Sequence, residues 1–169
     1  LTLTVDPGPP TRISVLDIHL NGDAAEDPAF QRAIRAAGLK EGDRLRHNRY
    51  RKLKQSLQQL LINHGYAEGT LTRHRLEVDR DRREARVILE VNSGPRYRFG
   101  DITLTGDEQI NEPLRRAYLQ FESGEPFSND KLLSTQQAYL GAGYFSAVRL
   151  DRREPDADSH TIDASIPSN

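Results

Sequence analysis

The stretch Gly94-Pro95-Arg96-Tyr97-Arg98-Phe99-Gly100-Asp101-Ile102-Thr103-Leu104-Thr105-Gly106-Asp107 decides the fold, because its outline occurs twice in the chain. The same order appears 86 and 84 positions earlier, as Gly8-Pro9 and then Asp17-Ile18-His19-Leu20-Asn21-Gly22-Asp23. Downstream, Gly42-x-x-Leu45 returns as Gly124-x-x-Phe127, and Gly65-Tyr66 returns as Gly143-Tyr144. A period of roughly 80 residues is too long for a solenoid repeat, so the copies are predicted to be small domains in tandem.

The repeat predicts two domains, at residues 10–93 and 94–169. Leu1-Thr2-Leu3-Thr4-Val5 aligns with Val87-Ile88-Leu89-Glu90-Val91, which lies just before the second Gly-Pro pair. Residues 1–9 are therefore expected to be the last strand of a preceding domain, and the chain to be a piece of a longer protein. Copies of this size bury only a modest core, so each should be stabilised by its neighbour.

Composition favours an ordered domain without thiol chemistry. The 169 residues carry a net charge of −1 and contain no Cys, which excludes disulfides, thiolate catalysis and Cys-type zinc sites. Although 29% of the residues are charged, the apolar residues are strictly periodic, and disordered chains lack such periodicity. The near-neutral balance disfavours a dedicated nucleic-acid binder, which normally has a basic excess.

Each copy has the pattern strand, helix, helix, strand, strand. In copy one the apolar periodicity predicts a strand from Ile13 to Leu20 with a phase shift typical of a bulge, helices over residues 28–37 and about 48–64, and a hairpin over residues 72–91. In copy two it predicts a strand over residues 97–104, helices over residues 113–121 and 129–140, with Ser128 as N-cap, and a hairpin over residues 145–166. The predicted fold class is α+β: two tandem β-α-α-β-β domains, each a three-stranded mixed sheet covered on one face by two helices.

This element order and the Gly-Tyr pairs resemble the POTRA domains of the BamA/TamA outer-membrane assembly superfamily. The run Gly94 to Ile102 and the upstream Leu45-x-His47-x-x-Tyr50-x-x-Leu53-Lys54 look most like the second and third POTRA domains of TamA. The resemblance implies a periplasmic location at the outer membrane and a C-terminal β-barrel in the full-length protein. It also implies a TamB-like periplasmic partner and nascent outer-membrane proteins or autotransporters as substrates, without nucleic acid.

The resemblance places partner binding at the second strand of each copy, because an unpaired sheet edge accepts an incoming strand. The predicted contact residues are Leu71, Arg73, Arg75, Glu77, Ala147 and Arg149. The charged members could equally protect the edge against aggregation. Gly94, Pro95 and Arg96 are predicted to form the interdomain joint, and Gly65, Tyr66, Gly143 and Tyr144 a structural motif.

No catalytic, metal or cofactor site is predicted. The five His residues are scattered, and the acidic run from Glu154 to Asp158 falls in a predicted turn. The basic run Arg44 to Lys54 is interpreted chiefly as the polar face of a helix, with anionic lipid headgroups or an acidic partner as alternatives.

Two rival functions stay open. One is the POTRA region of a two-partner-secretion transporter. The other is a KH-like tandem that binds RNA through a GxxG loop, but Gly38-Leu39-Lys40-Glu41-Gly42 is one residue too long and carries Glu.

Overall fold

The structure is a computed structural model that describes residues 8–106, 111–143 and 151–168. It forms two compact units. The first unit comprises Leu1–Leu60 and Gly69–Ser93, and the second comprises Leu61–Glu68 and Gly94–Asn169.

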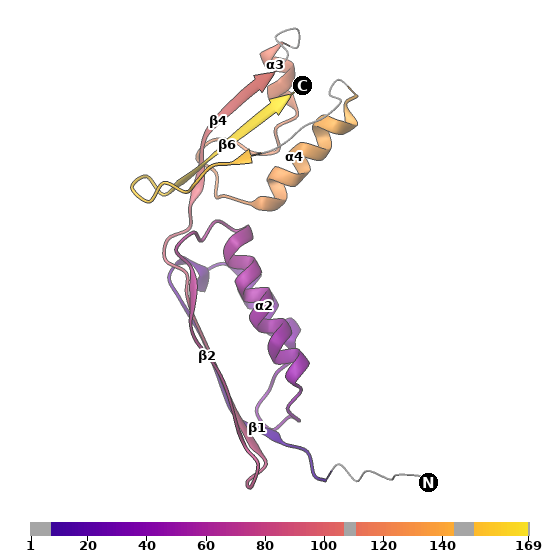
Figure 1. The fold of residues 1–169 in the computed structure, drawn as a ribbon, viewed down its shortest axis with the longest axis vertical. Helices are drawn as coiled ribbons and strands as arrows, with labels where there is room; N and C mark the ends of the chain where they lie inside the picture. Colours follow the sequence, from indigo (N-terminus) through magenta and orange to yellow (C-terminus); the bar gives the residue numbers. More distant parts are fainter. Residues whose placement is uncertain (1–7, 107–110, 144–150, 169) are drawn as a thin grey trace. The chain divides into compact units, whose positions relative to one another are not determined.

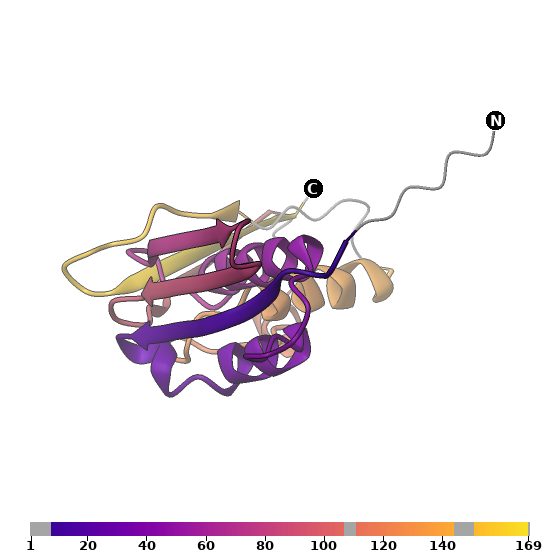
Figure 2. The ribbon, with the colours of Figure 1, turned by 90° about the horizontal axis from the view of Figure 1, so that it is seen from below.

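The first unit is a three-stranded sheet with helices on one face. Its elements are β1 (Arg12–Asn21), a 3-10 turn η1 (Asp23–Ala25), α1 (Pro28–Ala37), α2 (His47–Asn63), β2 (Thr70–Asp79) and β3 (Glu84–Asn92), although the end of α2 from Leu61 belongs to the second unit. The strand order is β1-β3-β2, with β3 parallel to β1 and antiparallel to β2, as Figure 2 shows. Figure 1 shows this sheet edge-on, with α2 along one side. The predicted mixed sheet is therefore confirmed.

The second unit repeats this plan in shorter form. Its elements are β4 (Arg98–Gly106), α3 (Glu112–Ala117), α4 (Asn129–Gly141), β5 (Asp151–Arg152) and β6 (Thr161–Ser168), and the strand order is β4-β6-β5. β4 is parallel to β6, and β5 is antiparallel to it. Residues 145–150 of the predicted hairpin lie outside the described residues.

The bulge predicted in copy one is present, and the first strand of the second unit has a bulge as well. The register of β1 shifts between Ile13 and Val15, and the register of β4 shifts between Phe99 and Ile102. The two units stabilise the bulge differently. The Ser14 hydroxyl donates to the Ala85 carbonyl in the first unit, at 3.2 Å.

In the second unit a carboxylate takes over this role. Asp163 Oδ1 accepts a hydrogen bond from the Asp101 N–H at 2.8 Å. A Cβ at Gly100 would lie 2.1 Å from that oxygen, so a larger residue there would displace the Asp163 carboxylate from the bulge.

Four helix ends have a defined cap or terminating glycine, among them the predicted N-cap Ser128. The Asp27 side chain accepts from the Ala29 N–H and begins α1, and Gly38 ends it in the left-handed region with φ 61°. The predicted N-cap Ser128 accepts from the Lys131 N–H at the start of α4. Gly65 lies just beyond α2 with φ 78°.

One helix is shorter than predicted. The sequence pattern extends the first helix of copy two to Phe121, whereas α3 ends at Ala117. The reason is packing: the ring of Phe121 stacks on Phe99 with centroids 4.0 Å apart, and the Gln120 N–H is bonded to the Thr135 hydroxyl instead of a helical carbonyl. Tertiary contacts thus override the local apolar pattern.

The two cores differ in composition. The first unit buries aliphatic side chains from the sheet and from α2, among them Ile13, Leu53, Leu57, Val87 and Leu89. The second buries an aromatic cluster with aliphatic neighbours: Tyr97, Phe99, Phe121, Phe127, Leu132, Ile162 and Ala164. Buried side chains of this size contribute roughly 1.5–3 kcal/mol each, so these clusters hold each sheet to its helices.

Candidate partner-binding edge

Strand β2 forms an outer edge of the first sheet, and its side chains alternate between the two faces. Arg73, Arg75 and Glu77 lie opposite Glu90, Ile88 and Arg86 of β3, which alternate with the fully buried residues of that strand. The three charged residues are therefore on the sheet face away from the helices. The predicted contact residue Leu71 lies opposite Val91, on the helix-covered face.

The hydrogen bonds around β3 determine which backbone groups of β2 are available at the edge. The Ser93 N–H donates to the Asn21 carbonyl at 2.9 Å, so odd-numbered residues along β3 turn their backbone groups toward β1. Even-numbered residues such as Glu90 face β2, and the Thr72 hydroxyl indeed donates to the Glu90 carbonyl at 3.3 Å.

The outward-pointing backbone groups of β2 follow from this parity. Arg73, Arg75 and Glu77 are paired with even-numbered residues of β3, so their N–H groups point into the sheet. Those of His74, Leu76 and Val78 point out of it. Within the described residues no hydrogen bond reaches these three groups, and β2 therefore presents an unpaired edge.

The charged side chains beside this edge have partners on the sheet itself. Arg73 Nε lies 3.4 Å from Glu90 Oε2, and an Arg75 guanidinium nitrogen lies 3.9 Å from Glu77 Oε1. Both Arg side chains are about 70% exposed, at 69% and 72%. Exposed pairs of this kind contribute little to stability, so they leave both Arg side chains available to a partner.

The opposite edge of the sheet, β1, is capped over its first half by the loop that precedes α2. The Ile13 N–H donates to the Asp43 carbonyl at 2.9 Å, and the Gly42 N–H donates back to the Ile13 carbonyl at 2.8 Å. Farther along, the Leu16 N–H donates to Glu41 Oε1 at 3.1 Å. An incoming strand would have to displace this loop, which favours β2 as the available edge.

The same cap occurs in the second unit. The Phe99 N–H donates to the Glu125 carbonyl and the Gly124 N–H donates to the Phe99 carbonyl, both at 2.8 Å. An arginine fastens each cap: Arg12 donates to the Gly42 carbonyl at 2.9 Å, and Arg98 to the Gly124 carbonyl at 2.8 Å. The repeated Gly42 and Gly124 have φ values of 85° and 89°, a conformation that favours glycine.

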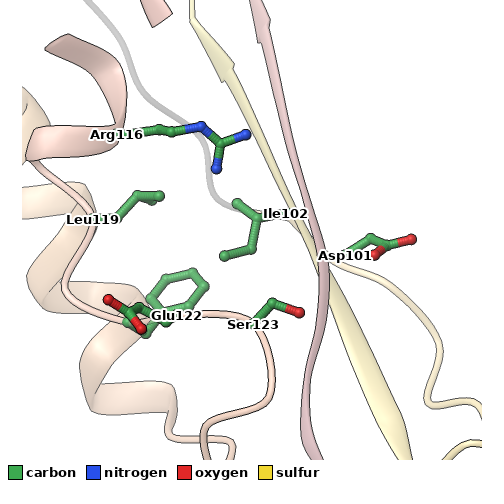
Figure 3. Close-up of a pocket in the computed structure, with 7 residues that line it drawn as sticks. Asp101, Ile102, Arg116, Leu119, Glu122 and Ser123 are labelled. Atoms are coloured by element: carbon green, nitrogen blue, oxygen red, sulfur yellow. The ribbon is translucent and has the colours of Figure 1, made fainter. Parts of the chain in front are cut away.

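The caps differ at one position, where the second unit has an open pocket. Ser123 stands where the first unit has Glu41. By sheet register, although not by the sequence repeat, Ile102 is the counterpart of Leu16, and no described group bonds the Ile102 N–H. Figure 3 shows Arg116 and Leu119 projecting toward Ile102, while Asp101 lies on the other side of β4. The edge of β4 is thus less completely covered than that of β1.

Among the residues predicted for the joint and the structural motif, two glycines have positive φ and one arginine makes hydrogen bonds, all within the second unit. Gly94 has φ 61° and Gly143 has φ 73°. The Arg96 side chain donates to the His64 carbonyl at 2.9 Å and to the Phe127 carbonyl at 3.2 Å, and it lies over the ring of the buried Tyr66. Tyr144, Ala147 and Arg149 lie outside the described residues.

Tyr97 and Asp156 have hydrogen-bond partners that shift their pKa values. Glu68 Oε1 accepts a hydrogen bond from the Tyr97 hydroxyl at 2.8 Å, and this bond raises the pKa of Tyr97. Hydrogen bonds from Ser159 and from the Asp158 N–H lower the pKa of Asp156. Among the described residues no group of three or more His, Asp or Glu is arranged to hold a metal ion, and no helix meets the length and apolarity of a membrane span.

Two features of the edge are not evident from the sequence. The parity of the β2 backbone depends on the register with β3, which a period-2 pattern does not fix. The arginine that fastens each cap is detectable only by aligning the copies, since Arg12 and Arg98 are 86 residues apart, as are Gly8 and Gly94.

Comparison with known proteins identifies both copies. The POTRA family model, described as surface antigen variable number repeat, matches residues 13–94 and again residues 97–166. POTRA domains 3–5 of BamA from Haemophilus influenzae are similar in structure with a TM-score of 0.59 and 13% identity, over 93% of this chain and 61% of that one. BamA from Haemophilus ducreyi lacking POTRA domains 1–3 gives a TM-score of 0.68 and 14% identity, over 94% and 29%. At these identities the likeness shows the fold alone, and this chain spans less than two thirds of either structure.

Proposed function

Because the chain belongs to the POTRA family in both of its copies, we propose that it is a periplasmic interaction module of an outer-membrane barrel protein that assembles or translocates other proteins. POTRA domains of Omp85-family proteins are periplasmic, are attached to the outer membrane, and bind proteins rather than catalyse reactions. The proposed module consists of domains at residues 10–93 and 94–169, with Gly94, Pro95 and Arg96 as the joint between them.

The observation that carries this proposal is the unpaired edge of β2. Three consecutive outward N–H groups, at His74, Leu76 and Val78, have no partner among the described residues, whereas the loop before α2 caps β1. A partner segment in extended conformation would continue the β1-β3-β2 sheet by adding a fourth strand. Its side chains would alternate past Arg73 and Arg75 on one face and past Leu76 on the other.

The finer assignment is to a TamA-like factor. The motif from Gly94 to Ile102 and the Leu45-to-Lys54 pattern support it, since both resemble the TamA subfamily. Under this assignment the partner is a TamB-like periplasmic protein, and the substrates are nascent outer-membrane proteins, autotransporters among them.

Proline substitution distinguishes strand addition from other modes of binding. His74→Pro removes an outward N–H from an exposed residue, so the sheet should remain intact, as proline is tolerated on the open side of an edge strand. Arg75→Pro is the matched control, because it removes an N–H that points at β3 and should destabilise the unit.

Binding is measured with peptides of about 10 residues that copy barrel strands, and with a TamB-like protein in pull-down assays. We expect His74→Pro to abolish binding while its thermal midpoint stays within a few degrees of the parent chain. Unchanged binding by a folded His74→Pro variant would contradict strand addition at β2. Retention of a secreted substrate instead of the TamB-like protein would contradict the TamA-like assignment.

A further inference from the structure

Helix α2 and the turn before it carry a dense basic array. Between residues 44 and 67 the chain has no Asp or Glu, and within the first half of that stretch it has six basic residues. We call these the α2 basic array: Arg44, Arg46, Arg49, Arg51, Lys52 and Lys54. Five of the six are charges without an ion pair or side-chain hydrogen bond among the described residues, the exception being Arg49, which donates to the Gly38 carbonyl at 3.0 Å.

The array does not help the helix to fold. The positive end of the helix dipole lies at the N-terminus, where cations are disfavoured, and the first turn of α2 contains no acidic residue. Arg46 occupies the N-cap position, because its carbonyl accepts from the Tyr50 N–H, and arginine is not a capping residue. In the second unit the equivalent position is Ser128, which does cap its helix.

The array is also not a by-product of an arginine-rich composition. At the equivalent positions the second unit has Pro126, Ser128, Lys131, Leu133, Ser134 and Gln136, with one basic residue among them. Residues 10–93 contain 16 Lys and Arg against 12 Asp and Glu, a net charge of +4, whereas residues 94–169 contain 8 against 12, a net charge of −4. The near-neutral net charge of the chain is therefore the sum of a basic first copy and an acidic second copy.

We propose that the α2 basic array binds the anionic phospholipid headgroups of the membrane to which the module is attached. The proposal rests on the function proposed above, which places the domains at a membrane surface. Headgroup phosphates form a laterally continuous anionic surface, and each Lys or Arg near such a surface adds to the attraction without a defined pairing geometry.

The surroundings of the array favour lipid over an acidic protein. A specific protein interface needs a well-packed apolar or aromatic centre. The exposed neighbours of Arg51 and Lys52 on α2 are polar, Asn48 and Gln55, and the only large apolar residue exposed on the helix is Ile62, near its far end. Electrostatic adsorption to a bilayer requires no such centre.

Vesicle co-sedimentation of the 169-residue chain tests the proposal. Vesicles of phosphatidylglycerol and phosphatidylcholine are compared with phosphatidylcholine alone, at low salt and at about 0.15 M salt, where the Debye length is about 8 Å. The test variant carries Arg44→Gln, Arg46→Gln, Arg51→Gln and Lys52→Gln. The matched control removes the same charge from the β2–β3 hairpin of the same unit, through Arg80→Gln, Arg82→Gln, Arg83→Gln and Arg86→Gln.

We expect the test variant to lose at least about tenfold in binding to the anionic vesicles and the control to lose about twofold, because only array residues lie near the headgroups. Equal losses in the two variants, or no binding by the parent chain, would overturn the proposal. Tighter binding to soluble polyglutamate than to vesicles would overturn it in favour of an acidic protein.

Two further variants distinguish loss of lipid binding from failure to fold and from loss of strand addition. If the fourfold variant fails to fold, the double variant Arg46→Ser and Arg51→Gln removes two charges while adding an N-cap, and should bind vesicles about threefold or more weakly. The His74→Pro variant should bind vesicles like the parent chain. Loss of strand addition and loss of lipid binding are therefore scored by different substitutions.

Discussion

The two copies keep the same edge cap and differ in the exposed surface of the long helix. In both, a glycine with positive φ and a fastening arginine hold a loop against the first strand: Gly42 with Arg12, and Gly124 with Arg98. Both copies therefore have the cap, whereas the exposed faces of their long helices differ in residue type. The loop that protects one sheet edge is thus a shared feature of the fold, whereas the exposed surface of the long helix is specific to each copy.

The long helices show this divergence at matched positions. Tyr50, Leu53 and Leu57 of α2 are buried, and so are their equivalents Leu132, Thr135 and Tyr139 of α4. On the exposed side, Arg51 and Gln58 of α2 correspond to Leu133 and Leu140 of α4, which are 50% and 45% exposed. The buried register is common to both helices, whereas at these two exposed positions α4 has apolar side chains in place of the polar ones of α2.

The largest effect should come from the glycines that follow the long helices. Gly65 and Gly143 both have positive φ, but a Cβ at Gly65 would lie 2.6 Å from the Cβ of Phe127, whereas no atom of the described residues lies within 4 Å of a Cβ at Gly143. Gly65→Ala should therefore cost about 3 kcal/mol of unfolding free energy, from backbone strain and overpacking together, and Gly143→Ala about 1 kcal/mol. Urea unfolding of both variants measures the difference. Equal losses would mean that backbone conformation alone requires glycine at both sites.

The second prediction concerns Tyr139, which replaces the aliphatic Leu57 of the first copy. Its hydroxyl donates to the Arg115 carbonyl, so Tyr139→Phe should cost about 1 kcal/mol at neutral pH. Burial raises the pKa of Tyr139 above the ordinary value of 10.0, against the opposing charges of Arg115 and Arg116. In the unfolded chain this tyrosine therefore ionises first, and stability should fall as the pH rises through 10 toward the folded pKa.

Unfolding free energies between neutral pH and alkaline pH check this expectation. Tyr139→Phe should weaken the alkaline loss without abolishing it, because the pKa values of Tyr50 and Tyr97 are also raised. An unchanged alkaline slope in Tyr139→Phe would show that this hydroxyl does not titrate differently in the folded state.

The third prediction exchanges the helix caps of the copies. Ser128→Ala removes the side-chain bond to the Lys131 N–H and should cost about 1 kcal/mol. Arg46→Ser should instead stabilise the first copy by about 0.5 kcal/mol, because it supplies a cap and removes a cation from the positive end of α2. Thermal unfolding of the two single variants measures both signs. A destabilised Arg46→Ser chain would show that the arginine has a structural role.

The apolar periodicity of the sequence is sufficient to predict the helices and strands, because buried residues recur with the period of the secondary structure. The bulge after Ile13, the Ser128 cap and the strand order were all accessible, since each follows from apolar spacing, capping chemistry or the duplicated pattern with its family resemblance. The end of α3 could not be predicted from the sequence, because Phe121 lies outside the helix and stacks on Phe99, which is 22 residues away in the chain. Local propensity carries no information about such a contact.

The candidate site was only partly accessible for a related reason. The sequence and the family resemblance indicated β2 as an edge, with Arg73, Arg75 and Glu77 among its residues, and these contact assignments stay predictions. Which of its N–H groups face outward depends on a one-residue register choice. The net charge of −1 for the whole chain conceals a charge of +4 in residues 10–93 and −4 in residues 94–169.

The smallest expected effect comes from giving α4 the exposed face of α2. The double substitution Leu133→Arg and Leu140→Gln alters two exposed side chains that are not part of the buried core, so the unfolding free energy should change by less than about 0.5 kcal/mol. Light scattering at high concentration should show less self-association, because two exposed apolar side chains one heptad apart on the same helix are lost. If the variant were destabilised by more than about 1 kcal/mol, the two leucines would have to pack against the rest of this chain, which would contradict their exposure on α4.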